Sequence, residues 1–151
     1  MRKLCPGLIL YFLSTSICFS QNPLKHPADA IEMRFSINAI VDQVCVIGSG
    51  LPQPMALLTL SETGRKRSTE ELHTELKNML KDINSSLDPH EKVFKIIVLR
   101  EQWLVENNLL TASLKIKRNK IEKRYAAFYE EWFETNGSIV LVDEQQTALI
   151  L

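Results

Sequence analysis

The chain has no surplus of charge of either sign. Its 151 residues include 18 Lys and Arg and 18 Asp and Glu, so the formal net charge is zero. Proteins that hold nucleic acid through its phosphate backbone need a surplus of Lys and Arg. The balance therefore argues against nucleic acid as the main partner. A chain of this length is long enough for one domain with its own hydrophobic core.

Cysteine is too scarce for a disulfide framework. Of the three cysteines, Cys5 and Cys18 lie within the first twenty residues, which leaves Cys45 in the body of the chain. Cys45 lies in the apolar run 44–47, so the sequence predicts a small buried hydrophobic side chain rather than a redox site.

Two common signatures of ligand-binding sites are also missing. The Gly-Ser-Gly segment at 48–50 lacks the spacing of a phosphate-binding loop, and we predict a turn there. The three histidines, His26, His73 and His90, lack the spacing of metal ligands. We therefore expect all three at the surface and no metal site.

The first twenty residues have the pattern of a secretory signal peptide. Arg2 and Lys3 precede a mostly apolar run, and residues 18–20 form a small-x-small site. The run is too short to span a bilayer. Residues 21–27, with two prolines, read as a linker. A genuine leader would make the protein secreted or periplasmic; alternatively, the leader results from a displaced reading frame or start codon and has no function.

The rest of the chain predicts an α+β domain at 28–142, a small sheet covered by helices, followed by a tail at 143–151. We expect a helix from 28 with Ile31 and Phe35 on one face, and another at 69–84 that begins with a capping box of Ser68 and Glu71. The predicted strands are 40–47, 55–60, 93–99 and 138–142.

A basic stretch at 106–125, ENNLLTASLKIKRNKIEKRY, stands out. Asn107 and Asn108 favour turns, and Asn119 followed by Glu122 predicts a capping box that opens a helix. The apolar residues of that helix would share one face: Ile121, Tyr125, Phe128 and Trp132.

Lys115 would then end a polar loop with a helix behind it. Such an arrangement presents an ammonium group to a carboxylate or a phosphate. The alternative is a solvated face, which is the usual role of a Lys/Arg-rich run at the start of a helix. On charge alone the solvated face is the favoured interpretation.

The segment LLTASLKIKR resembles the last signature of the adenylate-forming enzymes, most nearly that of the long-chain acyl-CoA synthetase branch. Lys115 matches the invariant C-terminal lysine, Ser113 its hydroxyl neighbour, and Arg118 the arginine three residues later. Ala112 stands where this branch usually has proline, and Asn108 where glycine is common. Residues 27–32 and 41–60 are similar to the same family, in the same order.

The resemblance implies the fold of the mobile C-terminal domain of these enzymes, which has a small mixed β-sheet. It also implies an AMP-forming fatty acid–CoA ligase whose N-terminal adenylation domain is the missing partner. ATP, Mg²⁺, coenzyme A and a fatty acid or other carboxylate would act in the parent enzyme, and none is expected to bind this chain alone. Localisation would be cytoplasmic or membrane-associated.

Lys115 is by this resemblance the electrostatic catalyst of adenylation, and Lys117 and Arg118 are weaker candidates for phosphate contacts or support. The first hypothesis is a C-terminal piece of an acyl-CoA synthetase that is inactive alone. The alternative is an exported, non-catalytic binding domain that reuses the same fold.

Overall fold

The structure is a computed structural model that describes residues 28–142 and 148–149. The predicted leader, the linker with His26, and most of the tail lie outside the described residues. The elements in chain order are α1 (Ala28–Ser36), β1 (Val41–Ile47), β2 (Met55–Leu60), α2 (Glu62–Arg65), α3 (Thr69–Asn84), β3 (Lys95–Leu99), α4 (Arg118–Tyr125), a 3-10 turn (Ala126–Phe128), α5 (Tyr129–Glu134), β4 (Ile139–Val142) and β5 (Ala148–Leu149).

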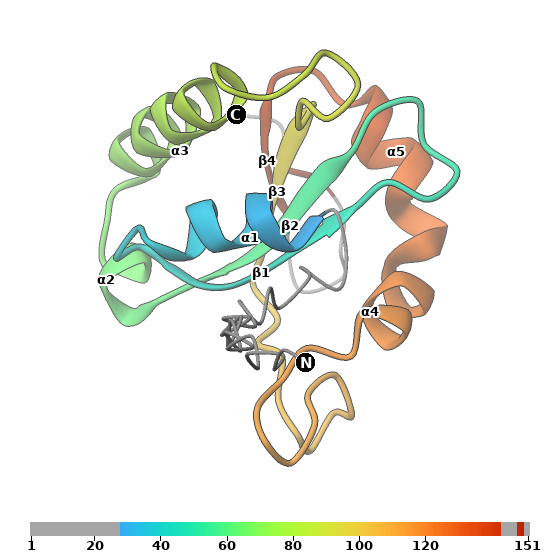
Figure 1. The fold of residues 1–151 in the computed structure, drawn as a ribbon. Coiled ribbons are helices and arrows are strands. Elements are labelled where there is room, and N and C mark those ends of the chain that lie inside the picture. The colour runs from blue at the N-terminus through green and yellow to red at the C-terminus, as the bar shows by residue number, and fades with distance from the viewer. Residues whose placement is uncertain (1–27, 143–147, 150–151) are drawn as a thin grey trace, which may run out of the picture.

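One mixed sheet organises these elements (Figure 1), which confirms the predicted α+β fold. The strand order is β1-β2-β3-β4-β5. The pairs β2–β3 and β3–β4 are parallel, whereas β1 and β5 pair antiparallel with β2 and β4 at the two edges. No element was predicted at β5, because two apolar residues carry no periodicity.

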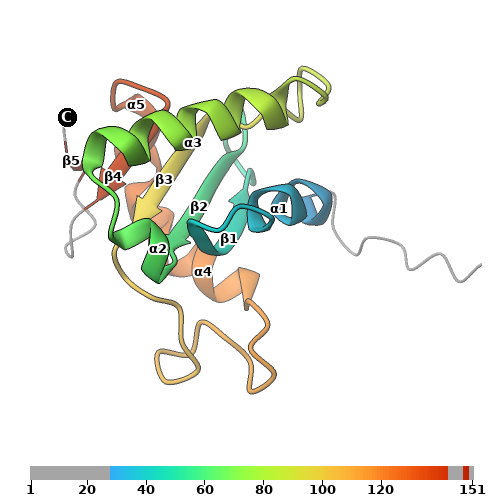
Figure 2. The ribbon, with the colours of Figure 1, turned by 90° about the vertical axis from the view of Figure 1, so that its left-hand side faces the viewer.

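Helices cover both faces of the sheet, so the core has two layers. Figure 2 shows α3 on the near face of the sheet and α4 and α5 behind it. On the first face, Phe35 of α1 and Leu76 of α3 pack with strand residues such as Leu58. On the second, Tyr125 and Trp132 pack with the alternate strand residues. Every central strand is therefore apolar on both sides, as its near-continuous hydrophobic sequence requires.

Helix α3 begins as predicted. Ser68 is its N-cap; its hydroxyl accepts a hydrogen bond from the backbone N–H of Glu71, and the Glu71 carboxylate accepts one from the N–H of Ser68. The apolar face of the helix is buried at Leu72, Leu76, Met79, Leu80 and Ile83. The capping box at Ser68 is confirmed.

The capping box predicted at Asn119 is wrong. Helix α4 begins two residues earlier than predicted, at Arg118, with Lys117 as an N-cap that makes no side-chain hydrogen bond. Asn119 therefore lies inside the first turn, where its amide cannot cap the helix. The predicted single helix is also divided by the 3-10 turn, which leaves Phe128 only partly buried.

Candidate functional site

The segment 100–117, between β3 and α4, projects away from the sheet in both ribbon views (Figures 1 and 2). Lys115 lies in this segment and is exposed. Its side chain makes no hydrogen bond or ion pair with any residue of 28–142 or 148–149. The predicted site lysine is thus on the most prominent loop of the described domain, with its ammonium group available to a partner.

A small hairpin holds the backbone of Lys115. Leu110 and Ile116 form an antiparallel bridge that closes it. The N–H of Thr111 donates to the carbonyl of Lys115 at 2.8 Å, and the Thr111 hydroxyl accepts from the N–H of Lys115 at 3.0 Å. Thr111 therefore fixes both backbone groups of Lys115 while leaving its side chain free to move.

Leu114, at the tip of the hairpin, has a left-handed backbone conformation. Its φ is 59° and the residue is 71% exposed. This region disfavours bulky residues because Cβ crowds the backbone. Strain of this kind persists when the surrounding structure fixes it, and it is concentrated at functional sites.

The N-terminal arm of the projecting segment is anchored to α4. Trp103 is fully buried, and its Nε1 donates to the hydroxyl of Tyr125 at 3.1 Å. That hydroxyl donates in turn to Glu101 Oε2 at 2.8 Å, and Arg124 pairs with the same carboxylate at 2.6 Å. Burial, together with the Glu101 charge, raises the pKa of Tyr125, so its hydroxyl stays a donor at neutral pH.

Lys117, on the C-terminal arm of the hairpin, binds two residues of the N-terminal arm. Its N–H donates to the carbonyl of Leu109 at 2.9 Å, and its Nζ donates to Asn108 Oδ1. Asn108 has φ 65°, which asparagine tolerates better than most residues. Asn108, which stands where the resembled branch commonly has glycine, therefore has a left-handed backbone conformation in this chain.

Arg118 is engaged in an ion pair within the domain. Its Nη2 lies 2.7 Å from Glu32 Oε1 and 3.5 Å from Asp29 Oδ1, both on α1. Its Nη1 donates to the carbonyl of Val46 at 2.7 Å and approaches Cys45 Sγ at 3.4 Å. The guanidinium joins α4 to α1 and to the edge of the sheet.

Cys45 is fully buried, as predicted. Burial raises the pKa of its thiol from 9.0 to about 12, although the nearby charge of Arg118 acts in the opposite direction. The thiol is therefore protonated at neutral pH and is a poor nucleophile. Of the histidines within the described residues, His90 is exposed and His73 partly so, as expected for surface residues.

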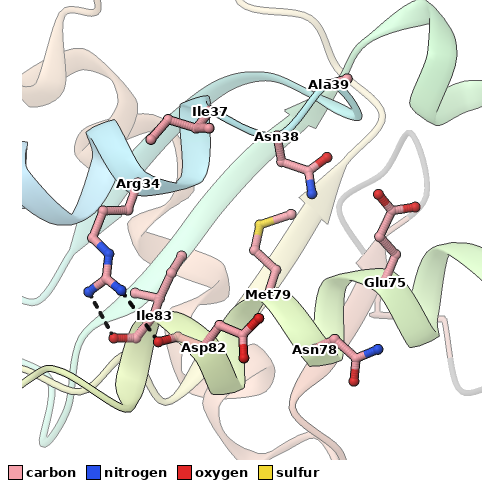
Figure 3. Close-up of a pocket in the computed structure, with 9 residues that line it drawn as sticks. All are labelled: Arg34, Ile37, Asn38, Ala39, Glu75, Asn78, Met79, Asp82 and Ile83. Atoms are coloured by element: carbon pink, nitrogen blue, oxygen red, sulfur yellow. Dashed lines mark hydrogen bonds between the residues drawn. The ribbon is translucent and has the colours of Figure 1, made fainter.

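The surface hollow shown in Figure 3 lies away from Lys115. It has a volume of about 600 Å³ and runs between the end of α1 and α3. Its lining residues are Arg34, Ile37, Asn38, Ala39, Glu75, Asn78, Met79, Asp82 and Ile83. None of them belongs to the projecting segment. Within residues 28–142 and 148–149, no group of three or more His, Cys, Asp or Glu could hold a metal ion, and no helix has the length and hydrophobicity to cross a membrane.

Residues 20–136 match the family described as the AMP-binding enzyme C-terminal domain. The chain belongs to this family. The match covers the helices on both faces, the first three strands of the sheet and the projecting segment, so the AMP-binding C-terminal domain is the unit that carries Lys115. A comparison with the curated proteins found no match.

Solved structures with the same fold include adenylation domains of carboxylate reductases. The one from Mycobacterium chelonae has a TM-score of 0.60 and 22% identity, over 70% of this chain and 17% of that chain. The A-PCP didomain of the enzyme from Segniliparus rugosus, in complex with AMP, has a TM-score of 0.58 and 21% identity, over 69% and 15%. The A domain of the same enzyme, with AMP and a co-purified carboxylic acid, has 0.57 and 20%, over 70% and 17%.

The AMP-binding C-terminal domain thus spans less than a fifth of each of these chains. The three basic residues singled out from its sequence have different environments: Lys115 is exposed, whereas Lys117 and Arg118 contact other parts of the domain. Sequence reasoning missed Glu32 and Glu101, the acids that hold the two ends of the projecting segment. Both are distant in sequence from the residues they bind, and no local pattern identifies them.

Proposed function

We propose that this chain acts as the C-terminal domain of an AMP-forming acid–thiol ligase of the acyl-CoA synthetase type, and that Lys115 assists adenylation. The observation that carries the proposal is the exposed ammonium of Lys115 on a projecting hairpin whose backbone is held by Thr111. The match to the AMP-binding family supports the adenylation chemistry. The resemblance of residues 109–118 to the long-chain branch supports the acyl-CoA part.

The chemistry explains why a lysine is needed. Adenylation brings a carboxylate and the α-phosphate of ATP together, and negative charge grows on the phosphoryl oxygens. An ammonium between these two anions offsets their repulsion, most strongly where water is excluded. Lys115 reaches such a site only from a loop that stands clear of its own domain, as this loop does. Lys117 would act at most as a second phosphate contact.

The remaining components belong, in this proposal, to a larger adenylation domain. That domain would bind ATP with its Mg²⁺, the fatty acid or other carboxylate, and coenzyme A, while this chain supplies Lys115. The protein would then act where ATP and coenzyme A are present, in the cytoplasm or at a membrane facing it. The second candidate, an exported binding domain, rests on the signal-like pattern of the first twenty residues.

A fusion protein tests the proposal. Residues 28–149 would replace the corresponding domain of the Segniliparus rugosus A domain, which shares this fold, and release of pyrophosphate from ATP and a carboxylic acid would be measured. We expect the fusion to form the adenylate and Lys115→Ala to slow it about a hundred-fold or more. Lys120→Ala, an exposed lysine at the start of α4, is the matched control.

Equal rates for Lys115→Ala and Lys120→Ala in an active fusion would contradict the proposal. The exported alternative makes a different prediction: the processed protein would be found outside the cytoplasm, and Lys115 would have no effect on any adenylation.

A further inference from the structure

We propose that Glu32 and Arg118 are a positioning pair that sets where the hairpin presents Lys115. The inference rests on the proposed function, because it concerns the same lysine. Neither residue would touch a substrate; both act through the backbone between α4 and Lys115.

The pair binds the free backbone groups at the edge of the sheet. The N–H of Val46 donates to Glu32 Oε1 at 2.7 Å, and the carbonyl of Val46 accepts from Arg118 Nη1 at 2.7 Å. The two side chains are themselves joined at 2.7 Å. Because β1 is an edge strand in the described sheet, this ion pair takes the place that a neighbouring strand would otherwise occupy.

Partial burial makes the pair stiff. The side chains of Arg118 and Glu32 are 20% and 16% exposed, so solvent screens their attraction less than that of a surface pair. Charge-assisted hydrogen bonds at this distance are among the stronger ones in proteins. Removal of Arg118 leaves the Glu32 carboxylate partly buried without its cation, which is costly. Removal of Glu32 leaves Arg118 with the weaker contact to Asp29 at 3.5 Å.

The position of Arg118 in the chain links this pair to Lys115. Arg118 is the first residue of α4 and follows Lys115 by three residues. Between them, Ile116 pairs with Leu110 and Lys117 is bonded to Leu109. The short segment from Lys115 to Arg118 is therefore held at its C-terminal end by the Arg118 guanidinium. Glu32 binds that guanidinium and so connects the segment to α1.

Helix α1, which carries Glu32, also offers a matched control. Arg34 of α1 donates to the carbonyls of Ile83 at 3.0 Å and Asp82 at 3.3 Å, at the C-terminal end of α3 (Figure 3). It joins two elements, as Arg118 does, but it has no contact with the projecting segment. Arg34→Met should therefore reproduce a general loss of stability without changing the hairpin.

The first experiment uses the chain itself and measures amide hydrogen exchange. In Arg118→Met we expect the amides of Thr111 and Lys117 to exchange at least about ten-fold faster, while the amide of Leu80 in α3 changes no more than it does in Arg34→Met. Unchanged exchange at Thr111 and Lys117 would overturn the inference. If Arg118→Met does not fold, Glu32→Gln replaces it, because glutamine keeps the acceptor for Val46 and removes only the charge.

The second experiment uses the fusion and compares the two half-reactions. We expect Arg118→Met to slow adenylation about ten-fold or more and to leave the transfer of a premade adenylate to a thiol unchanged, with Arg118→Lys recovering part of the rate. Equal rates for Arg118→Met and Arg34→Met, alongside a slow Lys115→Ala, would overturn the positioning role alone. A Lys115→Ala variant with full adenylation would instead overturn the proposed function.

Discussion

Leu114, which directly precedes Lys115, has a left-handed backbone conformation that leucine rarely adopts. Burial does not compensate for its φ of 59°, since the residue is 71% exposed. Leu114→Gly removes the clash of Cβ with the backbone, so we expect the free energy of unfolding to rise by about 1 kcal/mol. Urea unfolding measures this change.

The same substitution should loosen the hairpin. In the fusion, adenylation by Leu114→Gly is expected to fall several-fold even though the domain is more stable, as happens when a strained residue serves function. A variant that gains stability and keeps its full rate would show that the conformation of Leu114 has no part in presenting Lys115.

The buried thiol of Cys45 should make the domain less stable at alkaline pH. Burial, which Arg118 opposes, raises the pKa of its thiol from 9.0 to about 12. Above pH 9 the unfolded chain loses this proton while the folded chain keeps it, so the unfolded state binds fewer protons and stability falls as pH rises through this window. Between pH 8 and pH 10 this loss amounts to about 1 kcal/mol.

Urea unfolding of the wild type and Cys45→Ala at both pH values isolates this effect. Cys5 and Cys18 are present in both proteins, so they cancel in the comparison. We expect the wild type to lose about 1 kcal/mol more than the variant on going from pH 8 to pH 10. The same pH dependence in both proteins would mean that the buried thiol is not responsible.

At the scale of the element, the two predicted capping boxes have opposite outcomes, and a pair of alanine variants separates them. Ser68→Ala removes the cap of α3 and should lower the free energy of unfolding by about 1 kcal/mol. Asn119→Ala should change it by less than about 0.5 kcal/mol, because Asn119 lies inside the first turn of α4. Thermal unfolding of both variants checks the contrast; a larger cost for Asn119→Ala would contradict the observed start of α4.

The difference between these two helices shows what the sequence can predict. Helix α3 is set by local signals, a capping box and an apolar stripe, and its bounds were predicted correctly. The start of α4 is set by Arg118, which is held by Glu32 at a distance of 86 residues in the chain. A local pattern cannot contain that contact, so the capping signal at Asn119 was misleading.

Lys95 was predicted only as part of a strand, yet its side chain also binds the C-terminal end of helix α5. The residue is 3% exposed, and its Nζ donates to the carbonyls of Trp132, Phe133 and Thr135 at the end of α5. A cation there satisfies carbonyls that the helix leaves unpaired. Lys95→Met should therefore destabilise the domain by about 2 kcal/mol, measured by urea unfolding, whereas Lys92→Met, at an exposed position of the preceding loop, should have little effect.

At the scale of the whole molecule, a small sheet covered by helices follows from hydrophobic patterning, whereas the mixed order of its strands was implied by the resemblance to adenylate-forming enzymes. The position of Lys115 on a loop follows from its polar surroundings. The anchoring of that loop at both ends did not. Glu101 and Trp103 bind Tyr125, while Glu32 binds Arg118. These contacts join segments that are far apart in sequence, and they turn a loop into a fixed support for the lysine.

If Lys115 acts in the site of a larger adenylation domain, the covalent link between the two domains should increase the rate of adenylation. A flexibly linked domain acts at an effective concentration in the millimolar range. The fusion should therefore form adenylate at least about a hundred-fold faster than the same two parts mixed at about 10 µM each. Initial rates of pyrophosphate release give the comparison. Equal rates would mean that the two parts bind each other tightly without a covalent link.

The most direct test of the account is the ratio of the two half-reactions in the Lys115→Ala fusion, measured in single turnover. The account predicts that formation of the adenylate slows about a hundred-fold or more while thioester formation from a premade adenylate keeps its rate. An equal loss of both half-reactions, or no loss of the first, would contradict the role assigned to Lys115.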